Sequence, residues 1–132
     1  MRTIGASRAL ALVLTLVLAT PALVPARELH PLMAGWEQHF TVTWEAVQRR
    51  GRPTVAGQVD NRSPYRVGNV RVLVDSVDDS GRVVDQRVSW VLGELGAGSH
   101  LYFEVPATPA ARYRVSVFSY DRIDEAAMLM AP

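Results

Sequence analysis

Cysteine is absent from the 132 residues of the sequence. The chain can therefore form no disulfide, and it has no thiolate for nucleophilic catalysis or for a blue-copper site. A lipid-anchored signal sequence is excluded as well, because it needs a cysteine to carry the acyl chain. A domain of this kind has to be stabilised by its hydrophobic core, in which each buried Val, Leu or Phe contributes about 1.5–3 kcal/mol.

Lysine is absent too, so the 14 basic residues are all arginine. This bias is typical of GC-rich bacterial genomes. The formal net charge of +1 becomes about −1 if Arg2 and Arg8 are removed with the N-terminal segment, since 12 arginines then remain against 13 acidic residues. A nearly neutral chain without a basic patch argues against nucleic acid or an anionic membrane as partner.

The only long apolar run is close to the N-terminus. Arg2 and Arg8 precede an apolar stretch at residues 9–19, which Pro21 and Ala26 follow. The run is shorter than the ~20 residues that span a bilayer. Its charged start and small-residue end predict a signal peptide over residues 1–26, cleaved after Ala26, with Ala22 as second choice. We expect a periplasmic or secreted protein without stable membrane insertion after cleavage.

The rest of the chain lacks any long helical period, and its apolar residues alternate with polar ones, as is typical of strands. Six stretches show this pattern, at about residues 38–48, 54–60, 66–77, 82–92, 100–105 and 113–120. Turn-forming clusters separate them at residues 49–53, 61–64, 78–81 and 93–99. The pattern predicts an all-β, antiparallel, immunoglobulin-like or fibronectin III-like sandwich of six to seven strands.

The length suits one domain, which we place at residues 38–122. A flexible lead-in at 27–37, with one short helical turn starting at Pro31, would precede it, and a C-terminal tail at 123–132 would follow.

Several residues carry structural predictions within this frame. In the third stretch Val70, Val72 and Val74 should face the core, with a bulge near Asp75. In the fourth stretch one face carries Val84, Val88, Trp90 and Leu92, and the other Asp85, Arg87 and Ser89.

Three further residues are predicted to have structural roles. Gly57 predicts a bulge or a large neighbour, such as Trp44 or Trp90, lying close over the backbone. Asn61 should bond its own backbone in a turn. Tyr113 resembles a tyrosine corner, whose hydroxyl bonds upstream backbone.

The residues also resemble a known family, the FxLYD-type extracytoplasmic domains of bacteria. The similarity covers roughly residues 53–120 and rests on Gly57-x-Val59-x-Asn61-x-Ser63, Val67-x-Asn69-Val70-x-Val72-x-Val74, Asp78-x-x-Gly81-x-Val83-Val84, Leu95-x-x-Gly98, Phe103-x-Val105 and Tyr113-x-Val115-x-Val117. Asp78 occupies the position of the final Asp in the Phe-x-Leu-Tyr-Asp motif after which the family is named. The resemblance implies an immunoglobulin-like fold outside the cytoplasm and brings no catalytic residues.

Catalysis is not predicted. A serine triad would need His30, His39 or His100 beside a strained serine, and the sequence has no Gly-x-Ser-x-Gly elbow. No cofactor motif is present, so we expect a non-enzyme without a cofactor.

Metal binding is the alternative function, with copper or calcium as the ion. Periplasmic copper favours His and Met ligands, and candidates lie near both ends of the mature chain: His30, Met33, His39, Met128 and Met130. Asp75, Asp78 and Asp79 with Gly81 suggest calcium, although their spacing is not that of an EF-hand and acidic hairpin turns are common.

The leading hypothesis is non-catalytic contact with another envelope or secreted protein. If the last strand lies beside the third, the outward residues Arg71, Leu73, Phe118 and Tyr120 form an apolar and aromatic patch with an arginine rim. That composition is favoured at interfaces. The alternative is that residues 123–130 fold back over the patch and cover it.

Overall fold

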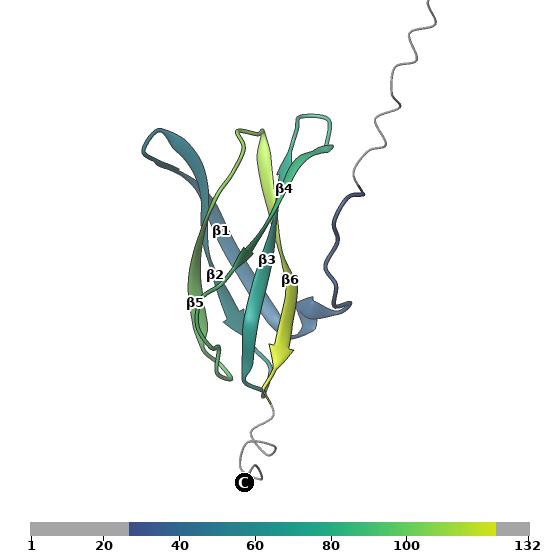
Figure 1. The fold of residues 1–132 in the computed structure, drawn as a ribbon, viewed down its shortest axis with the longest axis vertical. Helices are drawn as coiled ribbons and strands as arrows, with labels where there is room; N and C mark the ends of the chain where they lie inside the picture. The colour runs from purple at the N-terminus through teal and green to yellow at the C-terminus, as the bar shows by residue number, and fades with distance from the viewer. Residues whose placement is uncertain (1–26, 124–132) are drawn as a thin grey trace, which may run out of the picture.

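The structure, a computed structural model, describes residues 27–123. The predicted signal peptide at 1–26 and residues 124–132 of the predicted tail lie outside the described residues. The described part is all-β and forms two antiparallel three-stranded sheets, which confirms the six predicted strands (Figure 1). The strands are β1 (Phe40–Arg49), β2 (Arg52–Asn61), β3 (Val67–Val77), β4 (Val83–Trp90), β5 (His100–Pro106) and β6 (Arg112–Arg122), preceded by the short 3-10 helix η1 (Trp36–Gln38).

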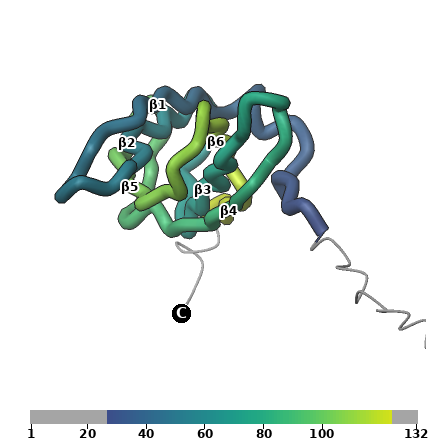
Figure 2. The backbone as a smooth tube through the Cα atoms, turned by 90° about the horizontal axis from the view of Figure 1, so that it is seen from above, coloured from purple at the N-terminus to yellow at the C-terminus, as the bar shows by residue number. Residues whose placement is uncertain are grey.

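One sheet has the strand order β1-β2-β5 and the other β4-β3-β6. Seen from above, the two sheets lie in separate layers (Figure 2). Residues directly opposite each other in two paired strands lie on the same face of the sheet. The alternation predicted from the sequence therefore gives each sheet one apolar face, and the apolar faces of the two sheets meet in the space between the sheets. Val70, Val72 and Val74 are buried in this core, as predicted. The core also contains Phe40, Val55, Val59, Val67, Val91, Leu95, Phe103, Val105, Ala107, Val115 and Val117.

The β1–β2 hairpin closes with a two-residue turn. Arg50 and Gly51 both have positive φ, 53° and 74°, as a type I′ turn requires. The ladder then runs without interruption from Arg49↔Arg52 to Phe40↔Asn61. The arginine-rich turn therefore fixes the register of the longest hairpin in the fold.

The two long sides of the sandwich are closed differently. On one side β1 contacts β6, where the rings of Phe40 and Tyr120 meet edge-on with centroids 4.7 Å apart. On the other side polar groups of β4 reach the neighbouring layer. Arg87 Nη1 donates to the carbonyl of Pro106 at 2.8 Å, and Asp85 accepts a 2.7 Å bond from the Thr108 hydroxyl.

The side chain of Asn61 is buried, and both its amide nitrogen and its amide oxygen make hydrogen bonds. Its amide donates to the carbonyls of Tyr65, Leu95 and Gly96, and its Oδ1 accepts from both the N–H and the hydroxyl of Ser63. The predicted local turn is confirmed, and the same side chain also ties down the loop after β4. Tyr113 behaves as predicted as well, because its hydroxyl donates to the carbonyl of Thr108 at 2.8 Å.

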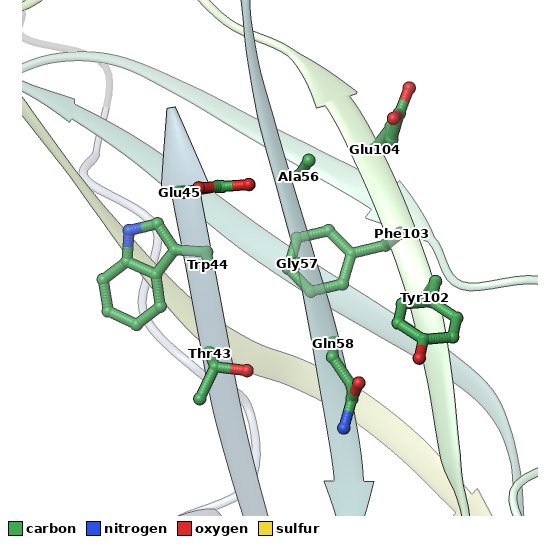
Figure 3. Close-up of a pocket in the computed structure, with 9 residues that line it drawn as sticks. All are labelled: Thr43, Trp44, Glu45, Ala56, Gly57, Gln58, Tyr102, Phe103 and Glu104. Atoms are coloured by element: carbon green, nitrogen blue, oxygen red, sulfur yellow. The ribbon is translucent and has the colours of Figure 1, made fainter. Parts of the chain in front are cut away.

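Gly57 has a large neighbour, but it is neither Trp44 nor Trp90. The ring of Phe103 from β5 lies over it (Figure 3). A Cβ added at Gly57 would lie 2.7 Å from Cζ of Phe103 and would also collide with the carbonyl oxygen of Thr43. Glycine is needed here because the neighbouring strand supplies a side chain that fills the space.

The predicted bulge near Asp75 occurs slightly later. The β3–β4 register shifts between Ser76 and Val77, where Ser76 faces Asp85 and Val77 faces Val83. The extra residue is therefore Val84, on β4. The helical turn predicted at Pro31 is also displaced, since the described helix η1 covers Trp36–Gln38.

Candidate interaction surface

The outer face of the β4-β3-β6 sheet is the surface predicted to bind a partner. β3 does lie beside β6, as predicted, and it also pairs with β4. The pairing places Arg71, Leu73 and Asp75 of β3 on this face, next to Trp90, Val88 and Gln86 of β4. Phe118, Ser119, Ser116 and Arg114 are the β6 residues of the same face. We call this surface the outer β3 face.

Two of the four predicted patch residues are not exposed. Leu73 is 1% exposed and Phe118 is 7% exposed. The prediction that they form an exposed apolar patch is therefore wrong. Arg71 remains partly exposed on the outer β3 face.

The chain that precedes β1 crosses the outer β3 face. Leu29 lies at β4, where its N–H donates to Gln86 Oε1 at 2.8 Å and its carbonyl accepts from Gln86 Nε2 at 3.0 Å. Leu32 lies at β6, where its N–H donates to the carbonyl of Phe118 at 2.8 Å. Figure 2 shows this segment on the side of the sheet opposite β1, β2 and β5. We call residues 27–35 the N-terminal strap.

A buried carboxylate anchors the strap to the sheet. Asp75 is 4% exposed and accepts bonds from Arg114 Nε at 2.9 Å and from Gln86 Nε2 at 2.9 Å. Arg114 Nη2 lies 2.8 Å from Asp75 and 3.7 Å from the carboxylate of Glu28 in the strap. Asp75 thus positions both side chains that hold the strap, and a buried charge of this kind has to be paired.

Tyr120 faces the opposite side of the sheet from the one predicted. Strict alternation from Val117 would put Phe118 outward and Tyr120 outward with it. The β3–β6 register shifts between Arg71 and Val72, and Phe118 is the extra residue of this bulge. The bulge reverses the phase of the strand, so Tyr120 packs against the core instead.

The exposed part of the outer β3 face is centred on Trp90, which is 57% exposed. The guanidinium of Arg71 stacks on the Trp90 ring and on the Phe118 ring, 5.1 Å from each centroid. Arg71 Nε also donates to the hydroxyl of Ser119 at 2.7 Å. The result is a layer of ring, guanidinium and ring across three strands, in which the Trp90 ring is exposed and the Phe118 ring is buried.

Sequence reasoning missed Trp90 as a surface residue. Its place in an alternating run with Val88 and Leu92 suggested a single apolar face but did not say which face turns toward the core. The β3–β4 pairing decides the face: Trp90 lies opposite Arg71, which the sequence places outward, and the two side chains make a cation–π contact.

Two of the three proposed calcium ligands, Asp75 and Asp78, have other partners, and Asp79 is exposed. Asp75 is bound to Arg114 and Gln86, as above. Asp78 accepts bonds from the Ser80 hydroxyl and N–H and from the Arg82 N–H in the β3–β4 turn. The Ser80 hydroxyl bond, followed by the Arg82 backbone bond, lowers the pKa of the Asp78 carboxyl. Within residues 27–123, no group of three or more His, Asp or Glu residues could hold a metal ion.

Two of the proposed copper ligands do come together. Met33 of the strap and His39 line one cavity of about 190 Å³ with Phe40, Ser63, Tyr65, Val67, Tyr120 and Arg122. The guanidinium carbon of Arg122 lies 3.3 Å from the centroid of the Tyr65 ring. Met128 and Met130, the other methionines of that prediction, lie outside the described residues.

Comparison of the chain with models of known protein families, with curated proteins and with solved structures gives no match. Over residues 27–123, no helix is long and apolar enough to cross a membrane.

Proposed function

We propose that this protein is an exported, non-catalytic immunoglobulin-like module that binds another envelope or secreted protein through the exposed part of the outer β3 face. The strand order supports the immunoglobulin-like assignment. Sheets β1-β2-β5 and β4-β3-β6 correspond to strands A-B-E and C′-C-F of such a sandwich. The tyrosine-corner bond of Tyr113 and the FxLYD-like sequence pattern agree with it.

Export is inferred from the N-terminal segment. Its charged start, short apolar run and small-residue end are those of a signal peptide cleaved after Ala26. The lack of cysteine is compatible with export because the core needs no disulfide at this size.

The observation that carries the binding proposal is the exposure of Trp90. An isolated tryptophan of 57% exposure on a sheet face leaves a large apolar ring in water. Tryptophan and arginine are the side chains that most often dominate protein–protein binding energies, and they do so best when already held rigid. Arg71 is held by two rings and by Ser119, so little side-chain entropy would be lost on binding.

The test is site-specific photocrosslinking in cells. A photoreactive residue at Leu92, which is 86% exposed and follows β4, should give an adduct of higher mass with the bound partner. Trp90→Ala should abolish this adduct. Tyr102→Ala is the matched control, since Tyr102 is 72% exposed on the other sheet, and it should leave the adduct unchanged. An adduct that persists in Trp90→Ala would overturn the proposal.

The Met33 and His39 cavity supports a second candidate function, the binding of a copper ion. Thioether and imidazole are the ligands that Cu(I) and Cu(II) accept, and both side chains face one cavity. Titration of the exported chain with Cu(I) against a competing chelator tests it. Saturable binding that is lost in both Met33→Leu and His39→Ala would support this function, and the absence of binding would remove it.

A further inference from the structure

The two sheets have four edge strands, and three of them carry features that discourage pairing with another strand. β4 turns the charged Asp85 and Arg87 toward the neighbouring layer and contains a bulge. β5 is short and ends at Pro106. β6 has two register shifts, and its Phe118 carbonyl is already occupied by the strap.

β1 is the exception. It is ten residues long, pairs with β2 in an unbroken register and contains neither proline nor glycine. Trp44 lies on its core-facing side, opposite Gly57, yet 40% of it is exposed at the open edge. Within residues 27–123, β1 is therefore the edge with the strongest tendency to accept a further strand.

The hairpin turn determines which N–H and C=O groups of β1 are free to bond a further strand. In a two-residue turn the carbonyl of Arg49 bonds the N–H of Arg52, so Arg49↔Arg52 is a hydrogen-bonded pair. Bonded and non-bonded pairs alternate in an antiparallel ladder. Val47 and Glu45 therefore also bond β2, whereas the N–H and C=O groups of Ala46 and Gln48 point away from it.

We propose that β1 pairs antiparallel with β1 of a second copy of this chain, around a twofold axis at Val47. In this register Ala46 bonds Gln48 of the partner subunit, and the symmetric contact repeats the bonds. Glu45 lies opposite Arg49 of the partner subunit, so two ion pairs form across the axis. The two three-stranded sheets become one six-stranded sheet, and the symmetry closes the assembly at two copies.

Charge selects this register over its neighbours. Centring the pairing on Glu45 would place two carboxylates directly opposite each other, which is destabilising. Centring it on Val47 instead puts opposite charges together. Arg49 is already held on the outer face of its sheet, because its Nη2 donates to Glu104 at 2.9 Å. This bond reaches across β2 to β5, so the guanidinium has to exchange Glu104 for Glu45 of the partner subunit when the two β1 edges pair.

Space also favours this part of the strand. The tip of the β1–β2 hairpin leans away from the β3–β4 hairpin at the same end of the molecule (Figure 1), whereas the start of β1 is packed against β6. A twofold axis near the tip brings the two hairpins together and keeps the bodies of the two copies apart.

The test is a charge swap read by analytical ultracentrifugation of the chain from residue 27 on. Glu45→Arg and Arg49→Glu should each weaken the dimer by about tenfold or more, because two ion pairs turn repulsive at once. An equimolar mixture of these two variants should dimerise again, since both contacts then join opposite charges. Glu94→Arg, an equal charge change far from β1, should leave the dissociation constant unchanged.

A backbone variant checks the pairing without changing charge. Ala46→Pro removes an N–H that faces away from β2, so the β1–β2 ladder keeps its bonds while the dimer loses two. The variant should be monomeric with an unchanged circular dichroism spectrum. A wild-type chain that stays monomeric at about 1 mM, or single charge variants that dimerise like the wild type, would overturn the proposal. Neither outcome bears on Trp90, which lies on the other sheet.

Discussion

The burial of Phe118 gives the most direct test of how the outer β3 face is built. If its ring were exposed, Phe118→Ala would change the free energy of unfolding very little. Because the ring is 7% exposed, we expect a loss near the lower end of the range for buried phenylalanine, about 3 kcal/mol. That is a large share of the roughly 5–15 kcal/mol that stabilises a domain of this size, and it lowers the melting temperature by about 12–24 °C.

Trp90→Ala is the matched control on the same face. Trp90 stacks on the same guanidinium but is 57% exposed, so its removal should cost about 1 kcal/mol or less. Urea unfolding followed by circular dichroism measures both variants. If Phe118→Ala were no more destabilising than Trp90→Ala, the ring would not be covered as described.

A double-mutant cycle identifies the cover. Deleting residues 27–35 removes the strap, and Phe118→Ala should then cost at least about 1 kcal/mol less than it does in the longer chain, because the ring is no longer buried beneath it. Additive losses would show that the strap does not cover the ring, although Leu32 bonds the backbone carbonyl of Phe118.

Three further predictions concern the sandwich itself. Gly57→Ala should destabilise it by about 1–3 kcal/mol in urea unfolding, because the new methyl group meets the ring of Phe103 and the β1 backbone; an unchanged midpoint would refute the close contact. Tyr113→Phe should cost about 0.5–1.5 kcal/mol through the lost bond to the Thr108 carbonyl, and a smaller cost would mean that water replaces it. The bond from the Thr108 hydroxyl lowers the pKa of the Asp85 carboxyl, so the ionised carboxylate stabilises the fold fully at neutral pH, and this contribution is lost as the pH falls below about 4. In Asp85→Asn the melting temperature should therefore fall less steeply with acid than in the wild type. Parallel melting-temperature curves for the two proteins would argue against this role.

Much of the frame follows from local sequence. Alternation predicts the six strands, and Val70, Val72 and Val74 identify the core side of β3 because period-two patterning records which face is buried. Asn61 and Tyr113 were also predictable, since their partners lie within a few residues along the chain.

The candidate surface was only partly predictable. Arg71 and its neighbours were placed on the correct face, but the alternation through Phe118 and Tyr120 shows no change of phase, so it did not indicate the bulge in β6. The extra residue at Phe118 therefore turned Tyr120 inward without any local signal. Likewise, Gly57 indicated a close neighbour, while only the β2–β5 pairing decided that it was Phe103.

The strands, the turns and the core side of β3 thus follow from the amino-acid sequence alone, because they depend on residues adjacent in the chain. Only the tertiary structure decided what lies over each face. Leu73 looked like part of an exposed patch, but it is 1% exposed, on a sheet face that a strap more than 30 residues earlier crosses; the strap is bonded there to Gln86 and Arg114. Exposure is a property of what packs on a side chain, and that long-range contact left Trp90 open beside the covered Phe118.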